Sequence, residues 1–188
     1  MSGADNGIAD TSATAGGAER RSRLRQYQVQ LLERMQAAKA GGAAASRELG
    51  VQSGQRRYLL DLTQVGEIVS CSDVTAVPLV QPWYQGLANI RGNLTGIVDL
   101  SSYRGEAPQA AGAESRFVTF APGLGVHCAL LATRVLGLRN LAEMTEQTEQ
   151  TEQQDAMGTQ FVDADGQRWT RLDLALLVRE ARFLDVGL

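Results

Sequence analysis

Few side chains of this 188-residue chain are of the types that do chemistry. His127 is the single histidine, so a histidine metal site has no second ligand and a Ser/His/Asp triad has one candidate base. The two cysteines, Cys71 and Cys128, are too few for a disulfide scaffold or a thiolate metal site. Because His127 lies within an apolar run, we interpret it as a tolerated strand residue. We therefore expect no enzyme active site, no metal and no cofactor.

Short motifs that resemble ligand-binding loops are incomplete. The motif G-x-x-x-x-G-K-[ST] of phosphate-binding loops is absent, and the only lysine is Lys39. The run Gly123-Leu124-Gly125 lacks the third glycine of a dinucleotide fingerprint, so we expect a turn there. The Asp-Ala-Asp-Gly run at 163–166 begins like a calcium loop, but its glycine stands at loop position four and a leucine at position twelve. The absence of catalytic groups favours a binding protein.

Charge is unevenly distributed along the chain. Residues 1–57 carry nine basic and five acidic side chains, a net charge of +4, whereas residues 58–188 carry nine and sixteen, a net charge of −7. An acidic body with few aromatic residues argues against a single-stranded nucleic-acid binder, which needs a basic groove and stacking platforms. The apolar runs fall short of the ~20 residues of a membrane span, and the first seven residues lack the features of a secretory signal. We expect a cytoplasmic protein without a nucleic-acid partner or direct membrane insertion.

The first 46 residues differ in composition from the rest. Residues 1–18 contain four glycines and five alanines, which predicts a disordered tail. Residues 19–46 are predicted to form a helix followed by a flexible linker, because one apolar stripe recurs at helical spacing before a Gly/Ala-rich run. The stripe consists of Leu24, Tyr27, Leu31 and Met35. It could dock on its own domain or on a partner, and we favour its own domain.

The body of the chain, residues 47–188, is predicted to be mainly β. Short apolar runs alternate with turn residues, and hairpins are predicted around residues 92–93 and 165–166. Asp173 is expected to cap a closing helix whose apolar residues Leu174, Leu177, Val178 and Ala181 share one face. An acidic low-complexity segment, 143–155, contains three consecutive Thr-Glu-Gln triplets and is predicted to be a solvated loop or frayed helix. This pattern favours small barrels or a sandwich.

Several stretches of this body resemble the CheW family of chemotaxis coupling proteins over residues 48–186. The resemblance lies in Val-Gly-Glu-Ile at 65–68, Pro-Trp-Tyr-Gln-Gly-Leu-Ala-Asn-Ile-Arg-Gly at 82–92 and Ile-Val-Asp-Leu at 97–100. Within the family, this chain is most similar to the PilI-type branch, which serves type IV pili. The similarity lies in the sequence at 82–94, in the Asp-Ala-Asp-Gly segment with Trp169, and in Phe-Leu-Asp-Val at 183–186.

The resemblance implies two small five-stranded, SH3-like barrels with short helices, and an N-terminal helical extension outside the family pattern. It implies a non-catalytic adaptor that couples the cytoplasmic tip of a methyl-accepting chemoreceptor to the regulatory domain of a CheA-type histidine kinase. In the PilI-type branch the output is twitching motility. The adaptor would lie in the cytoplasm, recruited to membrane-bound receptor arrays. A flagellar or other chemosensory system is the alternative, and a small-barrel nucleic-acid binder is a remote one.

The same resemblance suggests which residues bind the receptor or kinase. We hypothesise that Glu67 and Arg91 form an ion pair near a receptor groove, since arginine can direct its planar fork at a carboxylate. Ordinary surface pairing is the alternative, at ~0–1 kcal/mol. The full candidate set is Val65, Glu67, Asn89, Arg91, Gly92, Asp99, Val126, Leu130 and Val135. The family often has an acid in its second barrel where this chain has Thr133, so any contact of that acid is in doubt here.

Overall fold

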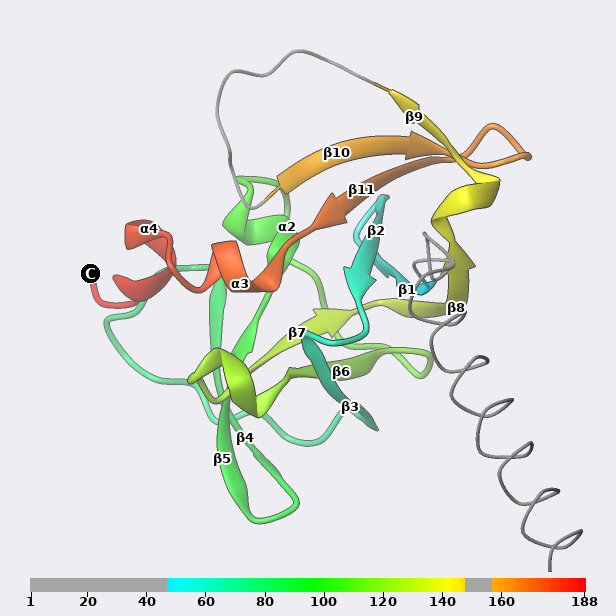
Figure 1. Ribbon diagram of the computed structural model, residues 1–188. Coiled ribbons are helices and arrows are strands. Elements are labelled where there is room, and N and C mark those ends of the chain that lie inside the picture. Colours follow the sequence, from blue (N-terminus) through cyan, green and yellow to red (C-terminus); the bar gives the residue numbers. More distant parts are fainter. Residues whose placement is uncertain (1–46, 148–156) are drawn as a thin grey trace, which may run out of the picture. The chain divides into compact units, whose positions relative to one another are not determined.

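The described part of the protein is built from two β-sheets (Figure 1). The computed structural model describes residues 47–147 and 157–188, so the predicted tail 1–18 and the helix and linker of 19–46 lie outside it. Sheet A has the strand order β8-β1-β2-β11-β10-β9. Its strands are β1 (Arg47–Ser53), β2 (Arg56–Asp61), β8 (Arg134–Asn140), β9 (Thr145–Gln147), β10 (Met157–Val162) and β11 (Arg168–Leu172).

Sheet B has five strands in the order β3-β6-β7-β5-β4. They are β3 (Val65–Ser70), β4 (Tyr84–Ile90), β5 (Asn93–Val98), β6 (Arg116–Phe120) and β7 (Cys128–Ala132). Each sheet contains one parallel pair, β2 with β11 and β5 with β7, among antiparallel pairs. The short helices are α2 (Leu100–Tyr103), η1 (Pro122–Leu124), η2 (Leu141–Glu143), α3 (Leu174–Leu177) and α4 (Ala181–Leu184).

One apolar cluster is shared by the two sheets. Sheet A contributes Leu49, Val51, Tyr58, Leu60 and Leu172, while sheet B contributes Val98, Val118, Phe120, Leu130 and Ala132. The rings of Trp83 and Phe183 stack within it, with centroids 5.6 Å apart, so the C-terminal helices close the cluster. The predicted mainly β fold of two small β units is confirmed, with β9 as a sixth strand in sheet A.

The chain crosses from sheet B to sheet A at Thr133, between β7 and β8. Both its backbone N–H and its hydroxyl donate to the carbonyl oxygen of Gln52 in β1, at 2.8 and 3.0 Å. The position at which the family often carries an acid therefore has a structural role in this chain. It fixes where the strand leaves one sheet and joins the other.

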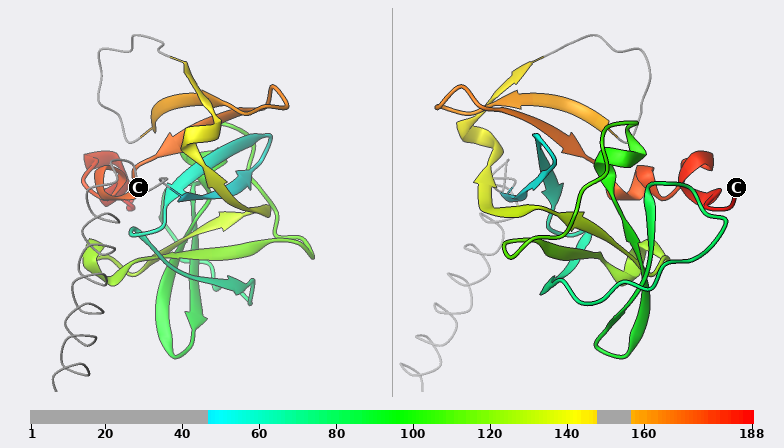
Figure 2. Two further views of the ribbon diagram at one scale, coloured as in Figure 1. Left: turned by 45° about the vertical axis from the view of Figure 1, so that its right-hand side comes forward. Right: turned by 180° about the vertical axis from the view of Figure 1, so that it is seen from behind.

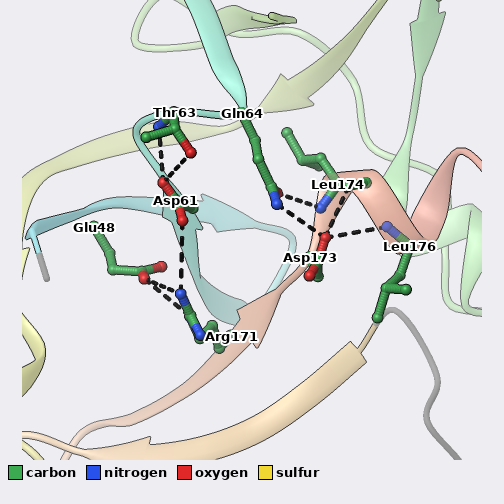
Figure 3. A network of polar contacts seen from close by, with 9 residues as sticks. Glu48, Asp61, Thr63, Gln64, Arg171, Asp173, Leu174 and Leu176 are labelled. Atoms are coloured by element: carbon green, nitrogen blue, oxygen red, sulfur yellow. Dashed lines mark hydrogen bonds and ion pairs between the residues drawn. The ribbon is translucent and has the colours of Figure 1, made fainter. Parts of the chain in front are cut away.

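A polar network ties sheet A to α3 (Figure 3). Glu48 is fully buried and its carboxylate accepts from Arg171, with Nη2 and Oε1 2.7 Å apart. This hydrogen bond raises the pKa of Arg171 above its ordinary value. Beside it, the amide of Gln64 donates to Asp173 at 3.0 Å and accepts from the backbone N–H of Leu174 at 2.8 Å. Asp173 caps α3, as predicted.

Sequence and structure differ in three places of sheet A and the C-terminal helices. The closing helix is divided into α3 and α4, because the backbone of Glu180 is extended (φ −63°, ψ 127°), and Ala181 is exposed. Strand β1 was not predicted, since its run 47–53 mixes charged, polar and glycine residues. The first Thr-Glu-Gln triplet of the segment 143–155 forms the edge strand β9, paired with β10, where a loop or frayed helix was expected. The other triplets lie outside the described residues.

Asp99 tests how far the fold depends on one buried carboxylate. It accepts hydrogen bonds from the backbone N–H of Ser101, the hydroxyl of Ser102 and the backbone N–H of Gln109, at 3.0, 2.8 and 2.7 Å. We expect Asp99→Ala to lower the free energy of unfolding by about 2–4 kcal/mol, because a cap is lost and buried donors are left without an acceptor. Urea unfolding measures this. The exposed Asp165, replaced by alanine, is the control and should change stability by less than about 0.5 kcal/mol.

Candidate protein-binding groove

A groove of about 460 Å³ lies between β3, the β4–β5 hairpin and η1. We call it the hairpin groove. The hairpin extends away from the rest of sheet B in all three views (Figures 1 and 2). The groove is lined by Gly66, Glu67, Ile90, Arg91, Asn93, Thr95, Thr119, Phe120, Pro122, Gly125, Val126, His127 and Cys128. Its lining therefore combines apolar walls with one charged rim.

The hairpin turn places Arg91 at this rim. Ile90 pairs with Asn93, so Arg91 and Gly92 are the two loop residues rather than 92–93. Both have positive φ, 51° for Arg91 and 88° for Gly92, as a type I′ turn requires. The Oδ1 atom of Asn89 accepts from the backbone N–H of Gly92 at 2.8 Å and holds the turn. A non-glycine residue in this region is uncommon, so the turn holds Arg91 in a costly conformation.

The predicted ion pair between Glu67 and Arg91 is present. Arg91 Nε lies 2.9 Å from Glu67 Oε2, and the pair bridges the hairpin turn to β3. The Glu67 backbone N–H donates to the Thr119 hydroxyl at 2.7 Å, which fixes β3 locally. The Arg91 side chain is 73% exposed and that of Glu67 48%, so the pair contributes no more than about 1 kcal/mol to folding. Its charges are therefore available to another molecule at little cost.

The structure brings only part of the candidate set together. Glu67, Arg91 and Val126 line the hairpin groove, and Asn89 and Gly92 shape its turn. The remaining four residues do not line it. Asp99 and Leu130 are buried, so they do not belong to a binding surface in this structure. Val65 is partly buried and packs against the shared cluster. Val135 lies in β8 of the other sheet.

Other lining residues were not predicted from the sequence. His127 is exposed beside the groove and lies outside any strand, contrary to its interpretation as a strand residue. Thr95 of β5 and Phe120 of β6 come from strands that are not neighbours in sheet B, so no local pattern indicates that both line one groove. The one local signal was the turn run Ala-Pro-Gly at 121–123, which forms η1 beside the groove.

The one thiol that lines the groove is a weak nucleophile at neutral pH. Cys128 pairs with Gly96 of β5, and burial raises the pKa of its thiol to about 11. Within the described ranges, no three His, Cys, Asp or Glu side chains gather as a metal site would require.

No described helix is long and apolar enough to span a membrane. The geometry is that of a β domain with an open groove beside its hairpin.

Comparison with known proteins shows which family has this two-sheet domain. The family model of the CheW-like domain matches residues 48–182. Protein PilI of Pseudomonas aeruginosa is 29% identical over 92 residues, which are 49% of this chain and about half, 51%, of that relative. The crystal structure of the scaffolding protein TtCheW from Thermoanaerobacter tengcongensis matches with a TM-score of 0.62 at 17% identity, covering 76% of this chain and 97% of that one.

The two-sheet architecture is therefore that of a chemotaxis-type coupling domain. The chain belongs to the CheW-like domain family. Within that family, PilI is a homologue.

The pH dependence of Cys128 alkylation tests whether this thiol is buried in the lining of the groove. With a pKa of about 11, about one thiol in a thousand is ionised at pH 8, compared with about a quarter of ordinary cysteine thiols. Since the thiolate is the nucleophile, we expect alkylation of Cys128 by iodoacetamide to rise about tenfold per pH unit from pH 8 to 10. Mass spectrometry of the native protein measures this. The urea-unfolded chain is the control, and an identical pH profile in both states would contradict the burial of this thiol.

Proposed function

We propose that this protein is a non-catalytic adaptor that couples a methyl-accepting chemoreceptor to a CheA-type histidine kinase. The cytoplasmic tip of the receptor and the regulatory domain of the kinase are its partners, and it acts in the cytoplasm at receptor arrays. Membership of the CheW-like family supports this role. The observation that carries it is the exposed Glu67–Arg91 pair at the rim of the hairpin groove.

The hairpin groove suits a receptor helix. Val126 lines it and is partly exposed, so the apolar face of an amphipathic helix can pack against this side chain. Ile90 and Phe120 also line the groove but are nearly buried and support it from below. Glu67 and Arg91 offer one charge of each sign beside them. Because the ion pair is weak, a helix that presents complementary charges can replace it without a large loss.

The output proposed for the pathway is twitching by type IV pili. The similarity to PilI supports this output, although it spans about half of that relative. Control of flagellar rotation, or another chemosensory output, is the alternative. The pathway does not change the proposed role of the groove.

Substitution of Arg91 tests the groove directly. We expect Arg91→Ala and Glu67→Ala each to weaken binding of the receptor tip at least tenfold, a change of about 1.4 kcal/mol or more. Binding of the kinase regulatory domain and the unfolding midpoint should change little. Isothermal titration with each purified partner measures this. Arg168→Ala, on the exposed start of β11, is the matched control. Unchanged receptor binding in both groove variants would refute the receptor site.

A charge-swapped variant separates direct recognition from positioning. Glu67→Arg combined with Arg91→Glu restores an ion pair between β3 and the turn while reversing the charges offered to a partner. If the two side chains contact the receptor, this double variant binds as weakly as the single variants. If binding recovers, the pair acts by holding the hairpin, and Arg91 is a positioning residue.

Deletion of the gene tests the output. We expect the deletion strain to lose twitching on a surface and to retain swimming, because the coupling protein acts in the pilus pathway. Subsurface twitching zones and soft-agar swimming zones measure the two outputs. Loss of swimming with normal twitching would assign the adaptor to a flagellar pathway instead.

A further inference from the structure

Three exposed leucines lie in α4 and in the bridge that the chain forms after it. Leu79, Leu184 and Leu188 expose 78%, 61% and 80% of their surface. Val80 pairs with Gly187 in an antiparallel bridge, which places Leu79 directly opposite Leu188, and Leu184 ends α4 four residues earlier. In Figure 1, α4 and the C-terminus lie apart from the tip of the β4–β5 hairpin. We call these three residues the leucine face.

The leucine face stands on a rigid frame. Leu188 donates its backbone N–H to the carbonyl of Leu79 at 3.0 Å, and Gln81 donates to that of Val186 at 2.8 Å. Between Leu184 and this ribbon, Val186 packs against the shared cluster. Just before Leu184, Phe183 is buried and stacks on Trp83. Because this backbone is already ordered, docking on the leucine face would cost little further conformational entropy.

The backbone of Leu79 is strained. Its φ is 58°, and among the described residues only Arg91 shares a positive φ without being a glycine. A glycine would occupy this conformation without strain. A leucine whose side chain is mostly in water gains little from burial in its own fold. Both facts indicate that the Leu79 side chain contacts another molecule.

Charges of both signs flank the leucine face. Arg182 and Asp185 are exposed, and neither forms an ion pair with another residue of 47–147 or 157–188. The Arg182 guanidinium lies over the Tyr103 ring, 4.6 Å from its centroid, which limits its motion. Of their neighbours, Arg179 is exposed and Glu180 accepts from the Tyr103 hydroxyl. An apolar centre beside one base and one acid is complementary to itself.

We infer that the leucine face is the contact between two copies of this chain, related by a two-fold axis. In such an interface the same patch serves both subunits, so Arg182 of each copy meets Asp185 of its partner while the leucines pack between them. A patch of three leucines is small, and its association is therefore weak and concentration-dependent. The hairpin groove stays free in both copies, so self-association does not depend on the proposed function.

Sedimentation equilibrium of the full chain tests this inference. Between about 10 µM and 1 mM, the range in which a small interface assembles, the wild type should pass from monomer to dimer. Leu79→Gly and Leu184→Ser should each weaken dimerisation at least tenfold. Leu79→Gly should leave the unfolding midpoint unchanged, because glycine suits its φ. Leu138→Ser, exposed on β8, is the matched control and should dimerise like the wild type.

Charge reversal distinguishes this interface from other routes to a dimer. Arg182→Asp and Asp185→Arg should each weaken the dimer, and the double variant should restore it, because the opposite charges meet again. A wild type that stays monomeric to 1 mM would overturn the inference. So would a dimer that the leucine variants leave intact, since another surface would then form it. Loss of receptor binding is not expected in any of these variants.

Discussion

The fold depends on one apolar cluster that both sheets share. The largest buried cluster takes its members from both sheets, whereas each of the two smaller clusters draws on one sheet. The crossing at Thr133 and the closure by Phe183 follow from this constraint, because each brings the chain back over the shared cluster. The lining of the hairpin groove includes Ile90 and Phe120, which belong to two of the buried clusters. The groove is therefore built on the same packing that holds the fold.

The carboxylates that stabilise the fold differ from the one at the proposed recognition site. The carboxylates of Glu48 and Asp99 are buried, the first paired with Arg171 and the second held by three donors, so they serve the fold. The carboxylate of Glu67 is half exposed and held by one flexible arginine. Burial thus sorts side chains of the same charge into two roles. A surface that contributes little to folding can change in sequence to meet a different partner without endangering the domain.

Local patterns predicted much of the fold and part of the groove. The hairpins, the Asp173 cap and the Glu67–Arg91 pair depend on residues close in sequence or on a family pattern. Leu130 is buried, because one sequence does not show which face of a strand meets the other sheet. Asp99 is buried because it caps α2 directly after β5. Strand β1 was not predicted because its pairing with β2 and β8, rather than its own composition, stabilises it. His127 lines the groove together with residues of other strands, a proximity that no local pattern indicates.

The edge strand β9 has a consequence for how the gene can vary. Its three residues, Thr145–Gln147, are the first of three identical triplets. Loss of one triplet from the coding sequence would place an identical Thr-Glu-Gln directly after Met144 and shorten only the connection to β10. Gain of one would lengthen that connection and again leave the same side chains at the edge. Slippage of the DNA polymerase in this tract would therefore change the number of residues between β9 and β10 and preserve the strand.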